Sequence, residues 1–131
     1  MDERAAAARP MNGYLFKAPK SKKKDVVRKG WTQRYFVIQG GKLLYFKRKS
    51  DITVKGEFDL STGPTVYGNV DAATGKEFTF KIVSGESDLA LYLRAMSADD
   101  RDQWVRALRR AGCALAAADD DDRSSSPPAA P

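Results

Sequence analysis

The sequence predicts a mainly β domain, in which seven antiparallel strands form a small barrel or sandwich and one C-terminal α-helix closes it. Short runs of alternating apolar and polar residues, bounded by turn residues, recur through most of the chain and are typical of half-buried strands. After Ser97 the apolar residues take the spacing of one face of an amphipathic helix. The length of 131 residues fits one such domain with tails.

The strand signals are strongest around a hairpin turn. Gln39-Gly40-Gly41-Lys42 separates two alternating runs, and its two glycines supply the positive φ angles that a tight turn requires. Thr65–Asn69 is the weakest of the seven signals. The predicted strands are Gly13–Ala18, Gly30–Gln39, Lys42–Lys49, Lys55–Leu60, Thr65–Asn69, Lys76–Val83 and Leu89–Met96.

The helix signal begins at Ser97, a good N-cap, followed by acidic residues that suit the positive end of the helix dipole. Arginines near the other end suit the negative end. Gly112 is a plausible stop, although Ala114–Ala118 could also continue the helix. The expected buried face contains Trp104, Val105, Leu108 and Ala111.

The ends of the chain differ in composition from the middle. Residues 1–11 are expected to be a disordered leader, and residues 117–131 a disordered tail, since the tail combines four aspartates with Ser, Pro and Ala. The folded unit is therefore expected over residues 12–116, without internal repeats.

Composition excludes several kinds of catalytic site. The chain has no histidine and only one cysteine, Cys113, which rules out a Ser–His triad, a Cys–His dyad and a histidine metal site. Nothing in the composition supports catalysis by a carboxylate or a lysine. We therefore expect no enzyme, no metal and no cofactor, and read Cys113 as incidental. A lone cysteine and the absence of a long apolar run favour a soluble cytoplasmic protein.

The net charge of +6 is unevenly distributed. Residues 1–56 contain 15 Lys/Arg against 4 Asp/Glu, whereas residues 57–131 contain 8 against 13. Such an uneven distribution of charge favours a polyanionic partner, namely phospholipid, inositol phosphate or nucleic acid. The alternative is a basic face that only keeps the protein soluble.

Four stretches and one tryptophan, in order, resemble the pleckstrin-homology (PH) domain family, and the resemblance covers about residues 12–112. It implies two nearly orthogonal antiparallel sheets, capped at one end by the helix and bearing variable loops at the open end. The matching stretches are Gly13–Lys17, Trp31–Ile38, Leu43–Lys47, Gly56–Leu60 and Trp104, which stands where the family has a helix tryptophan.

The resemblance also implies a headgroup site. The family binds anionic headgroups through Lys-Xn-(Lys/Arg)-X-Arg, for which Lys17 supplies the first element and Arg34 the last. The middle position is Thr32, which has a hydroxyl donor and no charge. By the same resemblance Tyr45 and Lys55 complete the pocket, although Tyr45 could equally be a packed strand tyrosine.

The strand period supports this site independently. Residues two apart share a face, so Lys17 follows Leu15, and Thr32 and Arg34 precede Phe36 and Ile38 on core-facing rows. Antiparallel pairing brings the end of the first strand beside the start of the second, where a guanidinium and an ammonium suit a phosphate. The alternative is that Arg34 pairs with a carboxylate such as Glu57 or Asp59.

The connection between the first two strands is strongly basic and contains an apolar pair, Val26 and Val27. Such a loop suits an anionic bilayer, with the valines entering the interface; the alternative is a hydrated hairpin tip. Its cations are Lys20, Lys22, Lys23, Lys24, Arg28 and Lys29.

These observations favour a non-catalytic, monomeric module that binds phosphoinositide headgroups or other anionic phospholipid and is reversibly recruited from the cytoplasm to a membrane. The alternative is a protein-interaction or regulatory domain that uses its sheet edge or helix, because fold does not decide between the two. A nucleic-acid partner is disfavoured, since the aromatics are expected in the core.

Overall fold

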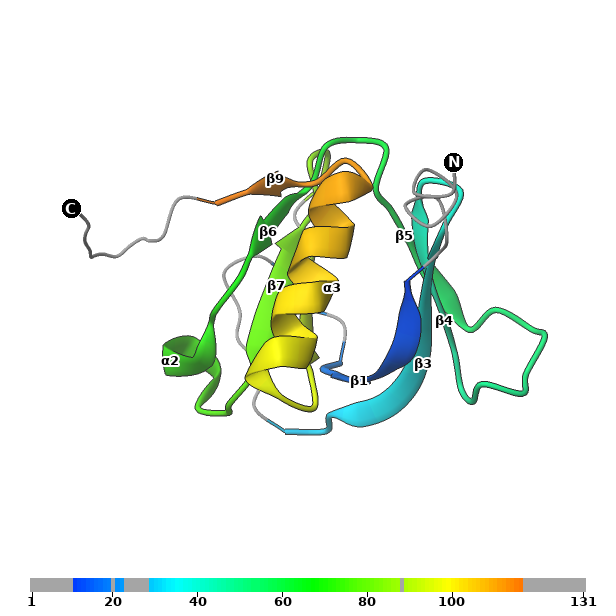
Figure 1. Ribbon diagram of the computed structural model, residues 1–131, viewed down its shortest axis with the longest axis horizontal. Helices are drawn as coiled ribbons and strands as arrows, with labels where there is room; N and C mark the ends of the chain where they lie inside the picture. Colours follow the sequence, from blue (N-terminus) through cyan, green and yellow to red (C-terminus); the bar gives the residue numbers. More distant parts are fainter. Residues whose placement is uncertain (1–10, 20, 23–28, 88, 117–131) are drawn as a thin grey trace.

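The computed structural model describes residues 11–19, 21–22, 29–87 and 89–116, which form nine strands and two helices (Figure 1). In chain order these elements are β1 (Asn12–Lys17), β2 (Ser21–Lys22), β3 (Thr32–Gln39), β4 (Lys42–Phe46), β5 (Gly56–Asp59), β6 (Thr65–Tyr67), α2 (Asp71–Thr74), β7 (Thr79–Val83), β8 (Leu89–Arg94), α3 (Ala98–Arg110) and β9 (Ala114–Leu115).

The strands form one hydrogen-bonded sheet in the order β5-β4-β3-β1-β8-β7-β6-β9, and β2 pairs with β8. The pairing is antiparallel except between β6 and β9. The expected fold of a mainly β domain with a closing C-terminal helix is confirmed. The expected strand count of seven is corrected to nine, because β2 and β9 have two residues each and are too short to show alternation.

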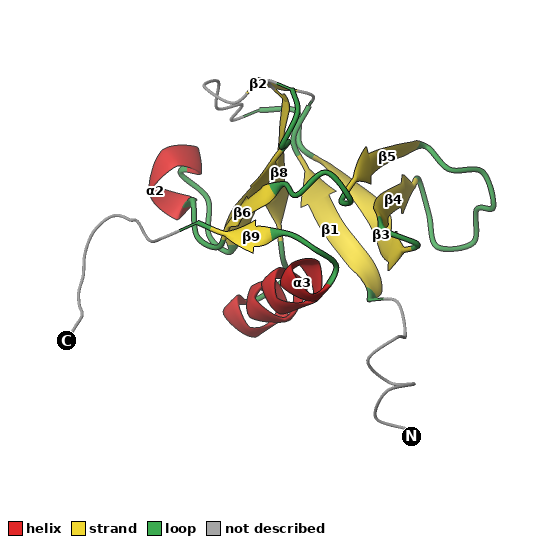
Figure 2. Cartoon of the chain, turned by 90° about the horizontal axis from the view of Figure 1, so that it is seen from above, coloured by secondary structure: helices red, strands yellow, loops and turns green. Residues whose placement is uncertain are grey.

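The sheet bends so that its halves face each other, with α3 against one end (Figure 2). Hydrogen bonding continues across this bend because Phe16 and Lys17 of β1 pair with Arg94 and Leu93 of β8. The two separate sheets that the resemblance implies are therefore joined into one.

Alternation along the strands builds the core. Leu15 and Phe36 are fully buried and Ile38 almost fully, as their shared face predicts. Trp104 of α3 is also fully buried, which confirms its core role. Other members of this cluster are Leu43, Leu60, Val66, Phe80, Ile82, Leu93 and Leu108.

The sixth predicted strand, Lys76–Val83, begins three residues later than expected, at Thr79. The reason is Asp71 at the start of α2. Its Oδ1 accepts hydrogen bonds from the backbone N–H (2.8 Å) and hydroxyl (2.6 Å) of Thr79, and its Oδ2 accepts from the N–H of Phe78 (3.3 Å). Phe78 has a positive φ of 63°, so the chain turns there before it can pair.

Helix α3 follows the predicted capping pattern. The Ser97 hydroxyl accepts a hydrogen bond from the backbone N–H of Asp100 (3.0 Å), as an N-cap does. The helix ends at Arg110, and Gly112 has a φ of 119°. The alternative that Ala114–Ala118 continues the helix is wrong where the chain is described, because Ala114 and Ala116 instead donate their N–H groups to Pro64 and Val66, each at 2.9 Å.

Neither α2 nor α3 is long and apolar enough to span a bilayer. Within the described ranges there is also no cluster of three or more His, Cys, Asp or Glu side chains suited to a metal ion.

Candidate functional site: a cationic mouth between two strand ends

A cavity of about 280 Å³ lies where the end of β1 meets β4, the start of β5 and the start of β8. Three of the predicted site residues line it, which places two lysines and a tyrosine around one hollow. The lining residues are Lys17, Tyr45, Lys55, Gly56, Glu57, Phe58, Leu89, Ala90 and Leu91.

Lys17 is half-buried at the wall of this cavity. Its Nζ donates a hydrogen bond to the carbonyl oxygen of Ala18 (3.0 Å) and lies 5.3 Å from the centroid of the Tyr45 ring. A cation over an aromatic face is stabilised by the ring quadrupole. The ammonium is thus positioned beside the tyrosine ring.

Tyr45 both packs in the core and lines the cavity. Its ring centroid is 5.3 Å from that of Phe36, while β4–β5 pairing sets Tyr45 opposite Gly56. A Cβ on Gly56 would overlap the Tyr45 hydroxyl and ring, so only glycine leaves room for the ring there. The two interpretations of Tyr45 from the sequence are therefore compatible.

Thr32 and Arg34 lie on the neighbouring strand and do not line the cavity. Thr32 is exposed and directly opposite Lys17, whereas Arg34 is opposite Leu15, two pairs further along. The Arg34 guanidinium donates to the carbonyl oxygen of Gln33 (2.9 Å). These two residues thus lie on the strand beside Lys17 and are not among the described residues that line its cavity.

The carboxylates that could have neutralised Arg34 are engaged elsewhere. Glu57 Oε2 lies 3.3 Å from Lys42 Nζ in an exposed ion pair. Asp59 accepts hydrogen bonds from the hydroxyl and the backbone N–H of Ser61, which hold its pKa below the ordinary value. Arg34 forms no ion pair with either carboxylate among the described contacts.

Most of the predicted membrane-contact loop falls outside the described residues: Lys20, Lys23, Lys24, Val26, Val27 and Arg28. The backbone of Lys22 belongs to β2 and pairs with Leu89, and Lys29 is exposed. Those loop assignments stay predictions.

A second basic loop, between β4 and β5, contains the charge cluster Lys47-Arg48-Lys49, which is evident in the sequence but was not assigned a binding role from it. Lys47, Arg48 and Lys49 are exposed there, and Ile52 is 94% exposed, the highest value among the large apolar side chains of the described chain. Val54 is 42% exposed, and the loop ends at Lys55, which lines the cavity. The signal available in the sequence was the same mixture of cations and β-branched apolar residues that drew attention to Val26 and Val27.

Comparison with known proteins agrees with the fold. A PH domain family model matches residues 9–112. The chain is 34% identical over 80 residues to a PH domain-containing protein of Dictyostelium discoideum, covering 61% of this chain and 17% of that protein. It is 30% identical over 107 residues to Rho GTPase-activating protein 22 of Mus musculus, covering 75% and 15%. The chain therefore spans less than a fifth of the length of these relatives.

Solved structures of PH domains are also similar to this chain in fold. The PH domain of human oxysterol binding protein-related protein 11 aligns with a TM-score of 0.62 and 25% identity, covering 79% of this chain and 80% of that one. The C-terminal PH domain of pleckstrin, solved in complex with D-myo-Ins(1,2,3,4,5)P5, aligns with a TM-score of 0.61 and 23% identity, covering 78% and 96%. The family model, the relatives and the shared fold together show that this chain belongs to the PH domain family.

Proposed function

We propose that this domain is a non-catalytic membrane-targeting module that binds phosphoinositide headgroups at the cavity between β1, β4 and β5. The observation that carries the proposal is the placement of Lys17, Tyr45 and Lys55 around one cavity of about 280 Å³. Two ammonium groups and a phenol supply hydrogen-bond donors and positive charge, which suits a phosphorylated ring.

The neighbouring strand extends the same surface. Thr32 and Arg34 offer a hydroxyl and a guanidinium beside Lys17, as the β1–β3 register places them. Arginine binds phosphate oxygens in a bidentate manner, whereas lysine acts as an adjustable point charge. Among the described residues that line the cavity, the one carboxylate, that of Glu57, is paired with Lys42, and this pairing weakens its repulsion of an anion.

The β4–β5 loop supports a membrane as the source of the headgroup. Its three exposed cations attract an anionic surface, and Ile52 gains free energy by leaving water for the acyl boundary. Because the loop ends at Lys55, a bilayer touched by Ile52 would present its headgroups close to the cavity. The complex of the pleckstrin domain with an inositol polyphosphate is a precedent on this fold. Reversible recruitment from the cytoplasm is part of the proposal.

A vesicle sedimentation panel tests it, using neutral vesicles, phosphatidylserine vesicles and vesicles that contain individual phosphoinositides, together with calorimetric titration of soluble inositol hexakisphosphate. A charge-assisted hydrogen bond contributes roughly 1.5–3 kcal/mol, so Lys17→Gln and Arg34→Ala should each weaken headgroup binding about ten- to a hundredfold. Arg110→Gln on α3 removes one charge elsewhere and is the matched control.

The proposal fails if the unaltered chain gives no heat with inositol hexakisphosphate and no preference for phosphoinositide vesicles. It also fails if Arg110→Gln weakens binding as much as Lys17→Gln does, because net charge alone would then explain the binding. Thermal melting of each variant separates a lost contact from a lost fold.

A further inference from the structure

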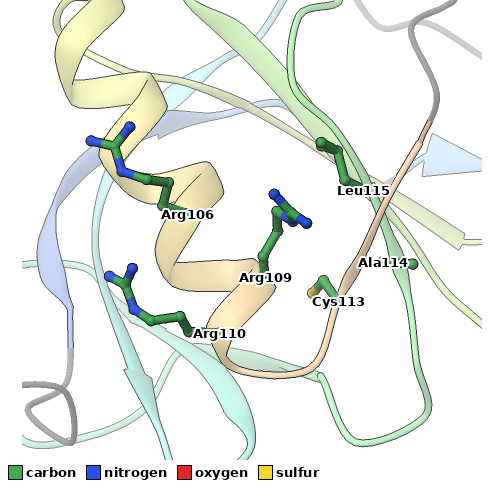
Figure 3. A pocket seen from close by; sticks show the side chains of 6 residues that line it. All are labelled: Arg106, Arg109, Arg110, Cys113, Ala114 and Leu115. Atoms are coloured by element: carbon green, nitrogen blue, oxygen red, sulfur yellow. The ribbon is translucent and has the colours of Figure 1, made fainter. Parts of the chain in front are cut away.

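A groove of about 410 Å³ lies between the C-terminal half of α3 and the segment that leads into β9 (Figure 3). Three arginines from the helix and the residues around β9 form its sides. The lining residues are Arg106, Arg109, Arg110, Cys113, Ala114 and Leu115. This site is separate from the cationic mouth and shares no lining residue with it.

The three arginines are exposed, and none of them forms an ion pair with a described residue. The acidic residues of α3, Asp99, Asp100 and Asp102, all lie toward its other end. Cations near a helix C-terminus do stabilise the dipole, but each contributes only about 0.3–1 kcal/mol and needs no groove. The result is a local excess of three positive charges beside a concave surface.

The opposite side of the groove is apolar. Leu115 is 45% exposed, and the nearly buried Cys113 and the small Ala114 lie beside it. Figure 3 shows the Arg109 side chain between the helix and Leu115, whereas the Arg106 and Arg110 side chains extend from the helix away from Leu115. The groove therefore combines guanidinium groups with a surface that an apolar side chain would cover.

The edge of β9 adds backbone groups to this surface. Ala114 and Ala116 donate their N–H groups toward β6. In a strand, alternate residues direct their N–H and C=O groups to opposite edges, so those of Leu115 face the edge away from β6. Among the described strands β9 is the last in the sheet order, so no described strand pairs with that edge.

We propose that this groove binds an extended acidic peptide segment of a partner protein. Its carboxylates would pair with the arginines, because a guanidinium matches a carboxylate in a bidentate manner. One apolar side chain of the segment would cover Leu115. Addition of an extended peptide to a free strand edge is a common mode of recognition, in which backbone hydrogen bonds give affinity and side-chain contacts give specificity.

The geometry favours a peptide over the other anionic partners. The groove is hollow and its leucine lies at the wall, whereas Ile52 protrudes from a loop as membrane contact requires. None of the described residues that line the groove is aromatic, so they provide no platform on which the bases of a single-stranded nucleic acid could stack. Helix α3 also lies at the opposite end of the barrel from β2 and the start of β8 (Figure 2). A domain held at a membrane would therefore keep this groove accessible.

The test uses the full chain and a fluorescein-labelled peptide of alternating glutamate and leucine, measured by fluorescence anisotropy at low salt. The variant R106Q/R109Q/R110Q should weaken binding about tenfold or more, since each exposed charge pair contributes on the order of 0.5 kcal/mol. The matched control is K47Q/R48Q/K49Q, which removes the same net charge from the β4–β5 loop and should change peptide affinity by less than about twofold.

Leu115→Ser keeps the inference testable if the arginine variant melts early, because Leu115 is already half-exposed and its loss should leave the fold intact. It should weaken binding of the glutamate–leucine peptide about threefold. A loss of this size corresponds to half or less of the free energy of burying a leucine side chain. It should not affect a peptide in which serine replaces the leucines.

Three outcomes would overturn the inference. Equal losses from the two triple variants would mean that binding follows net charge alone. Binding only after D119N/D120N/D121N/D122N would mean that the chain's own acidic run is the occupant. Loss of anionic-vesicle binding in the helix variant as large as in the loop variant would make the arginines a membrane surface. A failure of headgroup binding at the mouth leaves this inference unaffected, because the peptide assay contains no lipid.

Discussion

Lys17 connects the strand pattern to the proposed headgroup site. Its place on the core-facing row after Leu15 leaves it half-buried, and its ammonium is held between the Ala18 carbonyl and the Tyr45 ring. A charge in that position has fewer accessible conformations than one on a free surface stem. Less conformational entropy is therefore lost when an anion binds it.

Thr32 provides a gain-of-function test of this arrangement. It is directly opposite Lys17, so Thr32→Lys would add a second ammonium on the same face at about 5 Å between Cβ atoms. We expect affinity for soluble inositol hexakisphosphate to rise by on the order of 1 kcal/mol, or about fivefold. Titration calorimetry measures this.

Gln33→Lys is the control for that substitution, since it adds the same charge one residue further on, where the strand presents its other face. It should leave headgroup affinity nearly unchanged. Unaltered affinity in Thr32→Lys would show that the row of Thr32 and Arg34 does not face the ligand.

Cys113 gives a prediction on pH. Burial disfavours the charged thiolate and raises the pKa of this thiol to about 11. At pH 8 about one molecule in a thousand therefore carries the reactive thiolate. Alkylation by iodoacetamide should be slow in the native protein and should accelerate about tenfold for each pH unit until pH approaches 11.

The denatured chain is the control for Cys113, because exposure returns the thiol to its ordinary pKa and should make it react rapidly at pH 8. Rapid alkylation of the native protein at that pH would show that the groove opens and admits reagent.

Among the elements, the β4–β5 loop has the exposed side chains that most favour contact with a membrane. It has three exposed cations before Ile52, and internal contacts shape it: the backbone N–H of Lys49 donates to the Tyr14 hydroxyl (3.0 Å), and Arg48 Nε lies 3.8 Å from Asp51 Oδ1. An isoleucine that is 94% exposed has no packing role in the free protein. A membrane surface that covers Ile52 on binding would give this side chain a packing partner.

Ile52→Ser should therefore weaken vesicle binding and leave soluble headgroup binding unchanged. Full burial of an isoleucine contributes about 1.5–3 kcal/mol, and interfacial insertion about half of that, so partitioning into vesicles should fall about three- to twelvefold. Parallel measurements with phosphoinositide vesicles and inositol hexakisphosphate separate the two effects.

Met96→Ser, which alters another exposed apolar residue near the start of α3, should change neither quantity. If Ile52→Ser weakened both kinds of binding, Ile52 would support the cavity. If it weakened neither, the loop would remain in water when the domain binds.

Across the molecule, opposite ends of the barrel carry different surfaces. The cations of the mouth and the basic loops belong to residues 1–56, where the net charge is +11, and the arginine groove lies at the end of α3. A membrane and an acidic partner would thus approach from different directions, and neither would have to displace the other.

Charge segregation of this size predicts that vesicle binding weakens steeply with salt. Each Lys or Arg near an anionic surface contributes about 1 kcal/mol, and the Debye length falls from about 14 Å to about 4 Å as salt rises from about 50 to 500 mM. Sedimentation with phosphatidylserine vesicles over that range tests it. Constant binding would contradict an electrostatic mode, and neutral vesicles provide the baseline.

Features that depend on neighbours along the chain were predictable. Alternation in Gly13–Lys17 and Thr32–Gln39 places Leu15, Phe36 and Ile38 in the core, because a strand turns successive side chains to opposite faces. The start of α3 was equally clear, since the Ser97 cap and the acidic first turn act within four residues. These local signals predicted the mainly β fold, the closing helix and the resemblance to PH domains.

Features that depend on contacts between distant segments could not be predicted from the sequence. The turn at Phe78 arises from a carboxylate seven residues earlier, and β9 forms only because Pro64 and Val66 lie beside it. The predicted site grouped Lys17 with Tyr45, Lys55, Thr32 and Arg34. Of these partners only Tyr45 and Lys55 line the cavity with Lys17, since inter-strand register and side-chain direction decide which groups meet. The groove of Arg106, Arg109 and Leu115 was hidden for the same reason: a helix and an edge strand create it only when long-range packing brings them together.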